Sequence, residues 1–374
     1  MVVPLSVLDL APISAGSDAA TALANTVDLA RHAERWGYRR YWVAEHHFVG
    51  VASSSPAVLI GQIAAATSTI RVGSAAVQVG QTTAAAVVES FGILAAFHPG
   101  RIDLGLGRSG QRRAEADAAA PPADPVPAAP SGYRVVDGVV IPDAFDVGAL
   151  LKNSPLAETF SLLLQPGAQP PDFADQVADI AAFLDGTFRT ASGREVRATP
   201  GAGADVELWI FGSSKGQSAQ VAGVRGLPFV ANYHVSPGTT REAIEAYRTA
   251  FRPSAVLAEP YVVVSADVVV GPDEATARAL AATYGHWVHS IRSGHGAVPY
   301  PDPATTPPLT DAQRALVTDR LRTQFVGDPD QVVGRLAALQ RLTGADELVI
   351  TSVTHNHADR LRSHELLAAA WGLT

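Results

Sequence analysis

The segment IRVGSAAVQVGQTTAAAVVESFGILAAFHPGRIDLGLG, residues 70–107, joins two short apolar runs through a longer Ala-rich run. Residues 70–77 and 101–107 are rich in β-branched and small side chains, which predicts a strand in each. The Ala-rich residues 83–97 between them predict a helix. Nearly continuous apolar strands joined by a helical crossover are typical of a parallel sheet that is covered on both faces.

The same unit recurs along the chain. Further strands are predicted at 5–10, 38–45, 206–212, 227–234, 260–270 and 346–353. Helices are predicted at 19–36, 56–67, 172–184, 217–225, 239–251, 273–284, 311–323, 329–342 and 358–371. About eight strand–helix units predict an α/β fold of the closed (β/α)₈ type, a TIM barrel with insertions. The alternative is an open doubly wound sheet, which would require a Gly-rich turn after the first strand, where the chain has APISAGSDAA.

The pattern predicts a single barrel domain over residues 1–374 with two interruptions. Residues 111–171 hold Ala/Pro tracts, a hairpin at 133–142 with Asp-Gly at its turn, and a short helix near 146–152. We expect this insertion to be partly flexible. A Gly/Pro-rich loop at about 286–310 is the second interruption, and both are candidate lids over an active site.

The composition excludes several classes of protein. Lys and Arg number 28 against 36 Asp and Glu, a formal net charge of −8, and no basic stripe is present, which argues against nucleic-acid binding. The absence of cysteine excludes disulfides, thiolate metal sites and a cysteine nucleophile. No apolar run approaches the roughly 20 residues of a membrane helix, and the N-terminus lacks the features of a signal peptide. We expect a soluble cytoplasmic protein.

Polar residues follow the predicted strands, at the end of a barrel that carries the active site. Glu45, His46 and His47 follow the second strand. His46 is a candidate for proton transfer, since histidine titrates near neutrality; the alternative is a rim histidine that bonds a backbone group. Neighbouring side chains point to opposite sides of an extended chain, so we expect only one of the two histidines to face the site. Glu45 is expected to accept from a donor near the mouth of the barrel.

Two other segments predict a phosphate site. Gly107 leaves room for a flat ligand, and Arg108 offers a planar fork of donors suited to phosphate. The turn GSSKGQS (212–218) combines the start of a helix with hydroxyl groups, an arrangement that binds anions or merely caps the helix. Together the two segments favour a phosphate ligand.

The triplet His355-Asn356-His357 after the last strand allows a metal site, to which Glu45, His46 or His47 could contribute. A solvated rim or a helix cap is the alternative interpretation.

Taken in order, YWVAEHH, SSSPAVLIGQIAAATSTIRVGSAAV and HPGRIDLGLGR resemble the bacterial luciferase-like flavin monooxygenases, in particular the single-chain actinobacterial oxidoreductases. The resemblance extends over residues 1–110 and returns at 207–229 and 346–371. It implies a barrel enzyme that uses dioxygen and reduced flavin mononucleotide (FMN) from a separate flavin reductase. A flavin C4a-peroxide would then oxidise a small organic substrate such as an aldehyde. It also implies a homodimer.

The resemblance assigns roles to particular residues. His46 matches an acid/base histidine beside the flavin, and Ala75-Ala76 match a pair joined by a non-proline cis peptide at the flavin ring. The residues expected to bind the cofactor are Glu45, Ala75, Ala76, Gly107, Arg108, Gly212, Ser213, Ser214, Gln217 and Ser218, with Lys215 as an alternative in the phosphate role; no metal ligand is expected. The sequence departs from the family at Gly107, where luciferase has a reactive cysteine, and at Gly212, where the family has an acidic residue.

Three alternatives to a flavin-dependent monooxygenase stay open. A related branch of the family binds the deazaflavin F420 and transfers hydride. A non-catalytic flavin-binding protein and a metal-dependent barrel hydrolase are the others.

Overall fold

The computed structural model describes residues 3–108, 132–145 and 156–373, the side chains of 156 and 157 excepted. The Ala/Pro tracts and the helix predicted near 146–152 lie outside these residues. No helix within them is long and apolar enough to cross a membrane.

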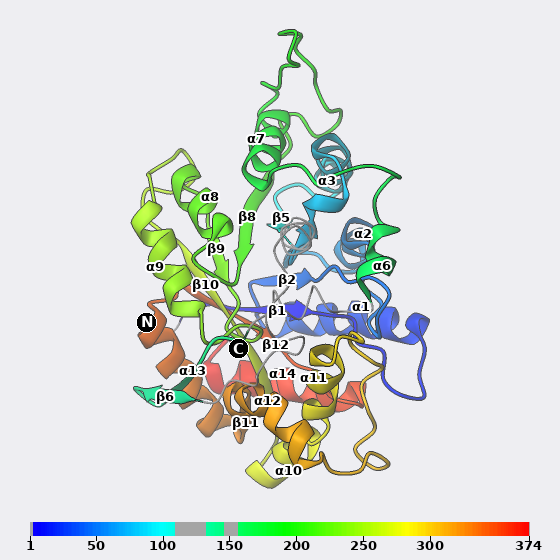
Figure 1. Ribbon diagram of the computed structural model, residues 1–374, viewed down its shortest axis with the longest axis vertical. Helices are drawn as coiled ribbons and strands as arrows, with labels where there is room; N and C mark the ends of the chain where they lie inside the picture. Colours follow the sequence, from blue (N-terminus) through cyan, green and yellow to red (C-terminus); the bar gives the residue numbers. More distant parts are fainter. Residues whose placement is uncertain (1–2, 109–131, 146–155, 374) are drawn as a thin grey trace.

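Eight parallel strands close into the barrel that the repeated units predict (Figure 1). In order around the barrel they are β1 (Leu5–Asp9), β2 (Arg40–Val43), β3 (Arg71–Ser74), β5 (Ile102–Gly107), β8 (Val206–Gly212), β9 (Phe229–Ala231), β10 (Val262–Val270) and β12 (Glu347–Thr351). The last strand pairs with the first, so that Val7 of β1 lies between Tyr41 and Ile350. The first and last thirds of the chain are thereby joined.

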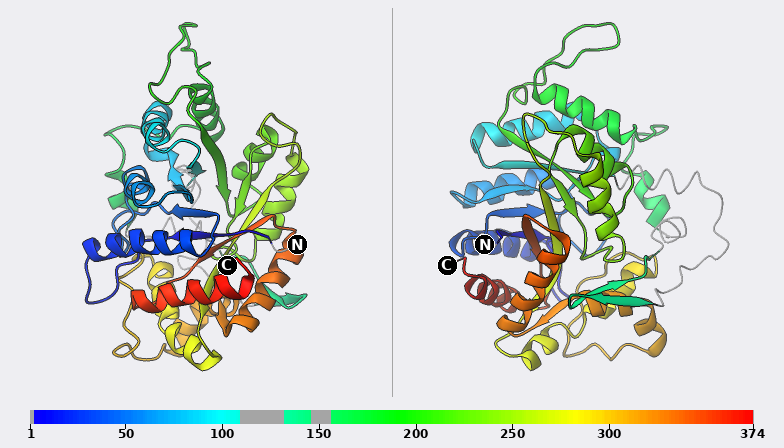
Figure 2. Two further views of the ribbon diagram at one scale, coloured as in Figure 1. Left: turned by 180° about the vertical axis from the view of Figure 1, so that it is seen from behind. Right: turned by 90° about the vertical axis from the view of Figure 1, so that its left-hand side faces the viewer.

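A helix returns the chain from each strand to the next. These helices are α1 (Ala19–Arg35), α2 (Pro56–Ala66), α3 (Ala84–Phe97), α7 (Phe173–Leu184), α8 (Gln217–Arg225), α9 (Thr240–Ala250), α13 (Pro329–Thr343) and α14 (His357–Trp371). Figure 2 shows α1 beside α14, where the ring of helices closes. Local sequence fixes their ends: Asp18 caps α1 by accepting from the Thr21 N–H, and Gly344 and Gly372 end α13 and α14 in the left-handed conformation.

Several elements lie outside the eight units. They are β4 (Val77–Gln78), the 3₁₀ turn η1 (Val79–Gln81), β6 (Tyr133–Val136), β7 (Val139–Pro142), α6 (Leu156–Ser161), α10 (Glu274–Leu280), α11 (Tyr284–Arg292), α12 (Asp311–Thr323) and β11 (Phe325–Gly327). The hairpin β6–β7 is as predicted, with positive φ at Asp137 and Gly138.

Three expectations about these segments are corrected. The helix predicted at 273–284 ends at Leu280, and the loop predicted from about residue 286 begins at 293 because α11 occupies 284–292. The strand predicted at 227–234 is reduced to β9. The short strand β11, which pairs with β10, was not predicted.

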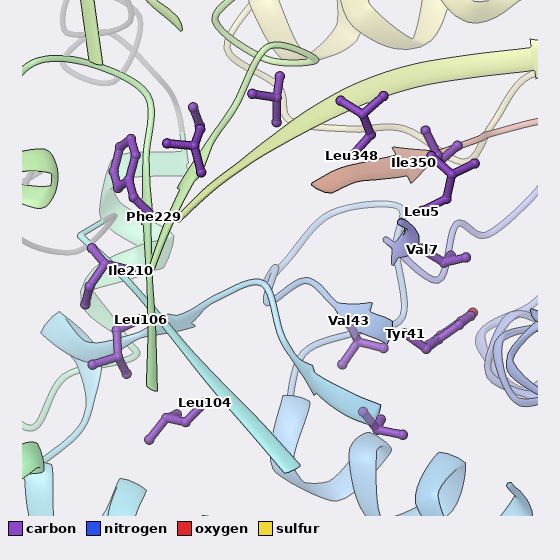
Figure 3. Close-up of a cluster of buried hydrophobic side chains, with 14 of the residues drawn as sticks. Leu5, Val7, Tyr41, Val43, Leu104, Leu106, Ile210, Phe229, Leu348 and Ile350 are labelled. Carbon is purple, nitrogen blue, oxygen red and sulfur yellow. The ribbon is translucent and has the colours of Figure 1, made fainter. Parts of the chain in front are cut away.

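The alternation of side chains along each strand divides the core into two layers. Alternate residues point outward and pack beneath the helices, as Figure 3 shows for Leu5, Val7, Tyr41, Val43, Leu104, Leu106, Ile210, Phe229, Leu348 and Ile350. The other residues fill the barrel, among them Leu8, Trp42, Trp209, Phe211 and Val349. The barrel is therefore a packed core and not a pore.

Charged residues close the amino-terminal end of the barrel. Arg40 is buried; its Nη1 donates to Asp103 at 2.7 Å, and its guanidinium lies 4.5 Å from the Trp209 ring centre. The Trp42 indole N–H also donates to Asp103, at 2.9 Å. Because these buried side chains close the amino-terminal end of the barrel, a ligand can enter only at the carboxyl end of the strands.

Candidate active site

A cavity of about 240 Å³ lies at the carboxyl ends of the strands. Ten of the eleven residues predicted for the site line it: Glu45, His46, Ala75, Ala76, Gly107, Arg108, Gly212, Ser213, Ser214 and Ser218. The described residues that line it without having been predicted are Leu8, Leu10, Ala44, Gln78, Phe211, Asn232, His234, Val235 and Ser236. The cavity lining thus combines polar side chains with the apolar side chains of Leu8, Leu10 and Phe211, which belong to the cluster that fills the barrel.

The two histidines after β2 take different directions. His46 lines the cavity, and its backbone N–H donates to Ser53 O at 2.9 Å. His47 turns away, and its Nε2 lies 2.8 Å from Glu45 Oε1. Only one histidine of the pair therefore faces the cavity, as the alternation of side chains predicts.

His46 is exposed at the cavity, while the protein around the ring still removes part of its solvent. Burial lowers its pKa to about 4, against the opposing effect of the Glu45 carboxylate. The ring is therefore neutral at pH 7. A neutral imidazole can accept a proton from a ligand.

The wall next to His46 contains a cis peptide bond between Ala75 and Ala76, as the resemblance implied. After this bond the chain continues as β4, where the Gln78 N–H donates to Glu45 Oε2 at 2.9 Å and Gln78 Nε2 donates to Glu45 O at 2.7 Å. Gln78 Oε1 is buried and accepts from no group in the described part of the chain. Because Gln78 lines the cavity, a ligand N–H could satisfy this oxygen.

Arg108 and the turn after β8 form the other end of the site. A methyl group built on Gly216 would lie 3.8 Å from Arg108 Nη1, which places the guanidinium against this turn. Gly216 is the N-cap of α8 and provides no side-chain cap. The backbone N–H groups of the first helical turn therefore stay available to a ligand beside the Arg108 guanidinium. Ser218, in this first turn, is buried and lines the cavity. A cation, helix amides and hydroxyls together suit a phosphate.

Gln217 is the predicted site residue that does not line the cavity. Its Nε2 donates to Asp172 at 2.8 Å, and this bond, with the nearby Arg108 charge, lowers the pKa of that carboxyl group. Lys215 also lies apart, since its exposed ammonium group is 3.6 Å from Glu242. Because the Gln217 side chain is engaged with Asp172, Gln217 can contribute only its backbone N–H to an anion site at the α8 N-terminus.

His234 is the titratable residue of the cavity that the predicted site omits. It follows the short strand β9, and its Nδ1 lies 2.5 Å from Ser265 Oγ. Burial, the nearby Arg320 and His46 lower its pKa to about 3. Its place at the end of a barrel strand was the signal available in the sequence.

The histidines after β12 do not reach the cavity. His355 Nε2 lies 3.0 Å from Ala15 O, and His357 Nε2 lies 3.0 Å from Asp28 Oδ2. Among residues 3–108, 132–145 and 156–373 no group of three or more His, Asp or Glu side chains could hold a metal ion. Asn356 caps α14 by accepting from the Ala358 N–H at 2.9 Å, in line with the capping interpretation.

The loop after α11 lies against the mouth of the barrel. Its Tyr300 N–H donates to Ile13 O at 2.7 Å, and Tyr300 O accepts from the Ala15 N–H at 2.9 Å. A Cβ on Gly50, in the loop after β2, would lie 2.4 Å from the backbone of this segment, so the two loops are in close contact. Residues 293–310 therefore border the loops that follow β1 and β2.

Comparison with known proteins agrees with this geometry. Residues 3–143 and 180–347 match the family model for luciferase-like monooxygenases. A luciferase-like monooxygenase of Escherichia coli strain K12 is 32% identical over 366 residues, 97% of this chain and 96% of that one. The uncharacterised protein YvbT of Bacillus subtilis is 37% identical over 369 residues, 98% and 96% of the two chains.

Solved structures have the same fold. The crystal structure of apo-MsnO8 superposes with a TM-score of 0.76 at 31% identity, covering 100% of this chain and 99% of that one. Two more distant structures share only the fold. One is the oxygenating constituent of 3,6-diketocamphane monooxygenase from Pseudomonas putida, in complex with FMN, with a TM-score of 0.63, 16% identity and coverage of 98% and 96%. The other is an F420-dependent secondary alcohol dehydrogenase, with a TM-score of 0.60, 13% identity and coverage of 99% of both chains.

Proposed function

This chain belongs to the luciferase-like monooxygenase family, and from that premise we propose that it binds reduced FMN and oxidises a small organic substrate with dioxygen. The observation that carries the proposal is the cavity, which joins an anion-binding end at Arg108 and α8 to a wall formed by His46, Ala75 and Ala76. One ligand with a phosphate and a flat ring fits both ends. The unpaired acceptor Gln78 Oε1 supports the fit, because flavins carry a ring N–H.

Each part of the site has a task in this reaction. Bound reduced flavin supplies two electrons to dioxygen, so that one oxygen atom can enter the substrate and the other leaves as water. Arg108 and the α8 amides hold the phosphate, and the Ala75–Ala76 wall supports the ring. His46 accepts or returns a proton, and the apolar side chains of Leu8, Leu10 and Phe211 exclude water.

Anaerobic titration tests the cofactor. We expect the purified protein to quench the fluorescence of FMN and to bind reduced FMN under argon more tightly than it binds F420. Addition of a flavin reductase, NADH and air should then consume an added aldehyde such as decanal, or another substrate found by mass spectrometry of a mixture of small organic compounds. Tight binding of F420 without binding of FMN would reject the proposal.

F420-dependent hydride transfer is the second candidate, because an F420-dependent enzyme shares the fold and an F420 phosphate would fit the same Arg108 end. The same titration separates the two cofactors. A non-catalytic flavin-binding protein would bind FMN but show no substrate-dependent oxygen consumption in the coupled assay.

We also propose that the protein is a cytoplasmic homodimer that receives its flavin from a separate reductase. Apolar side chains are exposed on the adjacent helices α2 and α3: Val58 is 66% exposed, Ile93 49% and Phe97 78%. Burial of such side chains against a second copy would stabilise a dimer. Light scattering should give twice the chain mass, and Phe97→Glu should lower it.

A further inference from the structure

The barrel places His46 and His234 on opposite walls of one cavity. His46 follows β2 and His234 follows β9. Around the barrel these strands are separated by β3, β5 and β8 in one direction and by β1, β12 and β10 in the other. The two rings are also close enough for the charge of one to affect the titration of the other.

The hydrogen bonds around His234 allow an assignment of its tautomer. Ser265 Oγ lies 3.4 Å from Ala231 O, to which it can donate, and it accepts from the His234 backbone N–H at 3.4 Å. If His234 Nδ1 donates to the same oxygen at 2.5 Å, the Ser265 hydroxyl keeps Ala231 O as its acceptor, beside the Tyr233 N–H that also donates to Ala231 O at 3.2 Å. This assignment leaves Nε2 without a proton, as a hydrogen-bond acceptor.

The charges behind His234 favour this neutral form. Arg320 of α12 is buried and donates to Tyr284 Oη at 2.7 Å. Asp267 of β10 interacts electrostatically with Arg320 and accepts from Gln324 Nε2 at 3.0 Å. On the opposite wall, Glu45 is engaged with His47 and Gln78. A second positive charge next to Arg320 would be repelled, so the ring stays neutral.

We propose that His234 contacts the bound cofactor and, by accepting a hydrogen bond at Nε2, favours reduced over oxidised FMN. This inference rests on the proposed function. Reduction of a flavin adds N–H groups to its ring, and only the reduced ring can donate from them. Because His46 and His234 both line the cavity, a flavin ring bound there lies between them, and Nε2 accepts from a ring N–H where it meets the ring edge, since these N–H bonds lie in the ring plane.

Affinity measurements test the discrimination. The dissociation constants of oxidised FMN and of reduced FMN under argon are measured for the wild type, His234→Ala and His234→Gln. Loss of one neutral hydrogen bond should weaken reduced FMN by about 3- to 10-fold and leave oxidised FMN nearly unchanged. His234→Gln, whose amide oxygen can accept, should recover part of the loss. His355→Ala, at the rim, is the matched control and should change neither constant.

Histidine NMR tests the tautomer independently of any activity. In protein labelled with ¹⁵N-histidine at pH 7, the His234 signals, assigned by their loss in His234→Gln, should show Nδ1–H and an unprotonated Nε2. Ser265→Ala should shift this ring towards the Nε2–H tautomer and lower the preference for reduced FMN. Addition of reduced FMN should move the Nε2 signal.

The outcomes separate this inference from the proposed function. If FMN binds in neither oxidation state, the proposed function itself fails. If FMN binds and His234→Ala weakens both states equally, or if reduced FMN leaves the Nε2 signal in place, the His234 inference alone is overturned.

Discussion

Among the proposed site residues, His46 is the one whose role, proton transfer, a single substitution tests most directly. In His46→Asn the cavity keeps its shape, because the His46 backbone holds the loop through Ser53. We expect FMN affinity to change less than about threefold, while turnover falls by roughly 10²- to 10⁴-fold, the usual contribution of a general acid or base. The measurements are flavin fluorescence titration and the reductase-coupled assay.

The pH dependence gives a second readout of His46. Burial lowers the pKa of its ring to about 4, so the basic form exists throughout the neutral range and is lost only below about pH 5. Turnover limited by His46 should therefore stay level from pH 8 down to pH 5.5. Turnover of His46→Asn equal to that of the wild type would remove this residue from the mechanism.

Arg108 is expected to distinguish FMN from riboflavin, which lacks the phosphate. Because a charge-assisted hydrogen bond contributes about 1.5–3 kcal/mol, Arg108→Ala should weaken FMN by roughly 10- to 150-fold and leave riboflavin unchanged. Lys215→Ala is the control, since Lys215 does not line the cavity and lies beside Glu242. Equal weakening of FMN and riboflavin by Arg108→Ala would place the phosphate elsewhere.

At the scale of single elements, the sequence predicts a strand or helix well where local pattern and packing agree. The run at 70–77 reads as one strand, yet the structure divides it into β3 and β4 at a cis bond that no periodicity reveals. Helix α11 was missed because Gly285 lowers helix propensity. In the fold a Cβ at Gly285 would lie 2.6 Å from Leu309 Cδ1, so the Leu309 side chain would have to move to admit a larger residue there.

Two glycines, one within a strand and one within a helix, provide a matched pair of substitutions that test the stability of the fold. A Cβ on Gly105 of β5 would lie 2.1 Å from Ser74 O and 2.5 Å from Phe211, whereas one on Gly334 of α13 meets nothing within 4 Å. Gly105→Ala should lower the free energy of unfolding by about 1–3 kcal/mol or more, because the added methyl group overpacks the core. Gly334→Ala should raise it by roughly 0.5–1 kcal/mol, because alanine favours the helix. Urea denaturation measures both, and opposite signs are the essential result.

For the whole molecule, the closed barrel followed from counting strand–helix units, since each unit is encoded locally and eight of them close. The count and the family resemblance together named eleven site residues, ten of which line one cavity. What they did not provide is which residues face each other. The opposition of His46 and His234 depends on strand order and on side-chain direction after β9, a strand too short to show a pattern.

Stability should depend on pH through the histidines that the fold buries. His364 of α14 is the clearest case: it is 1% exposed, and neither ring nitrogen has a hydrogen-bond partner in the part of the chain that the structure describes. Burial lowers its pKa to about 3, against roughly 6.5 in the unfolded chain. Between these values the unfolded state binds the extra proton, so stability falls as the pH falls below about 6.5.

Variants that cannot titrate isolate this contribution. One group contributes at most about 1.4 kcal/mol per pH unit, or roughly 2 kcal/mol between pH 6.5 and pH 5. We therefore expect the unfolding free energy of His364→Leu to fall by about 2 kcal/mol less than that of the wild type from pH 7 to pH 5, measured by urea denaturation. His364→Gln is the control, because it keeps a polar side chain that cannot titrate. It should differ from His364→Leu in absolute stability but show the same reduced dependence of the unfolding free energy on pH. Parallel curves for all three proteins would mean that His364 is protonated in the folded state and that its charge finds a partner there.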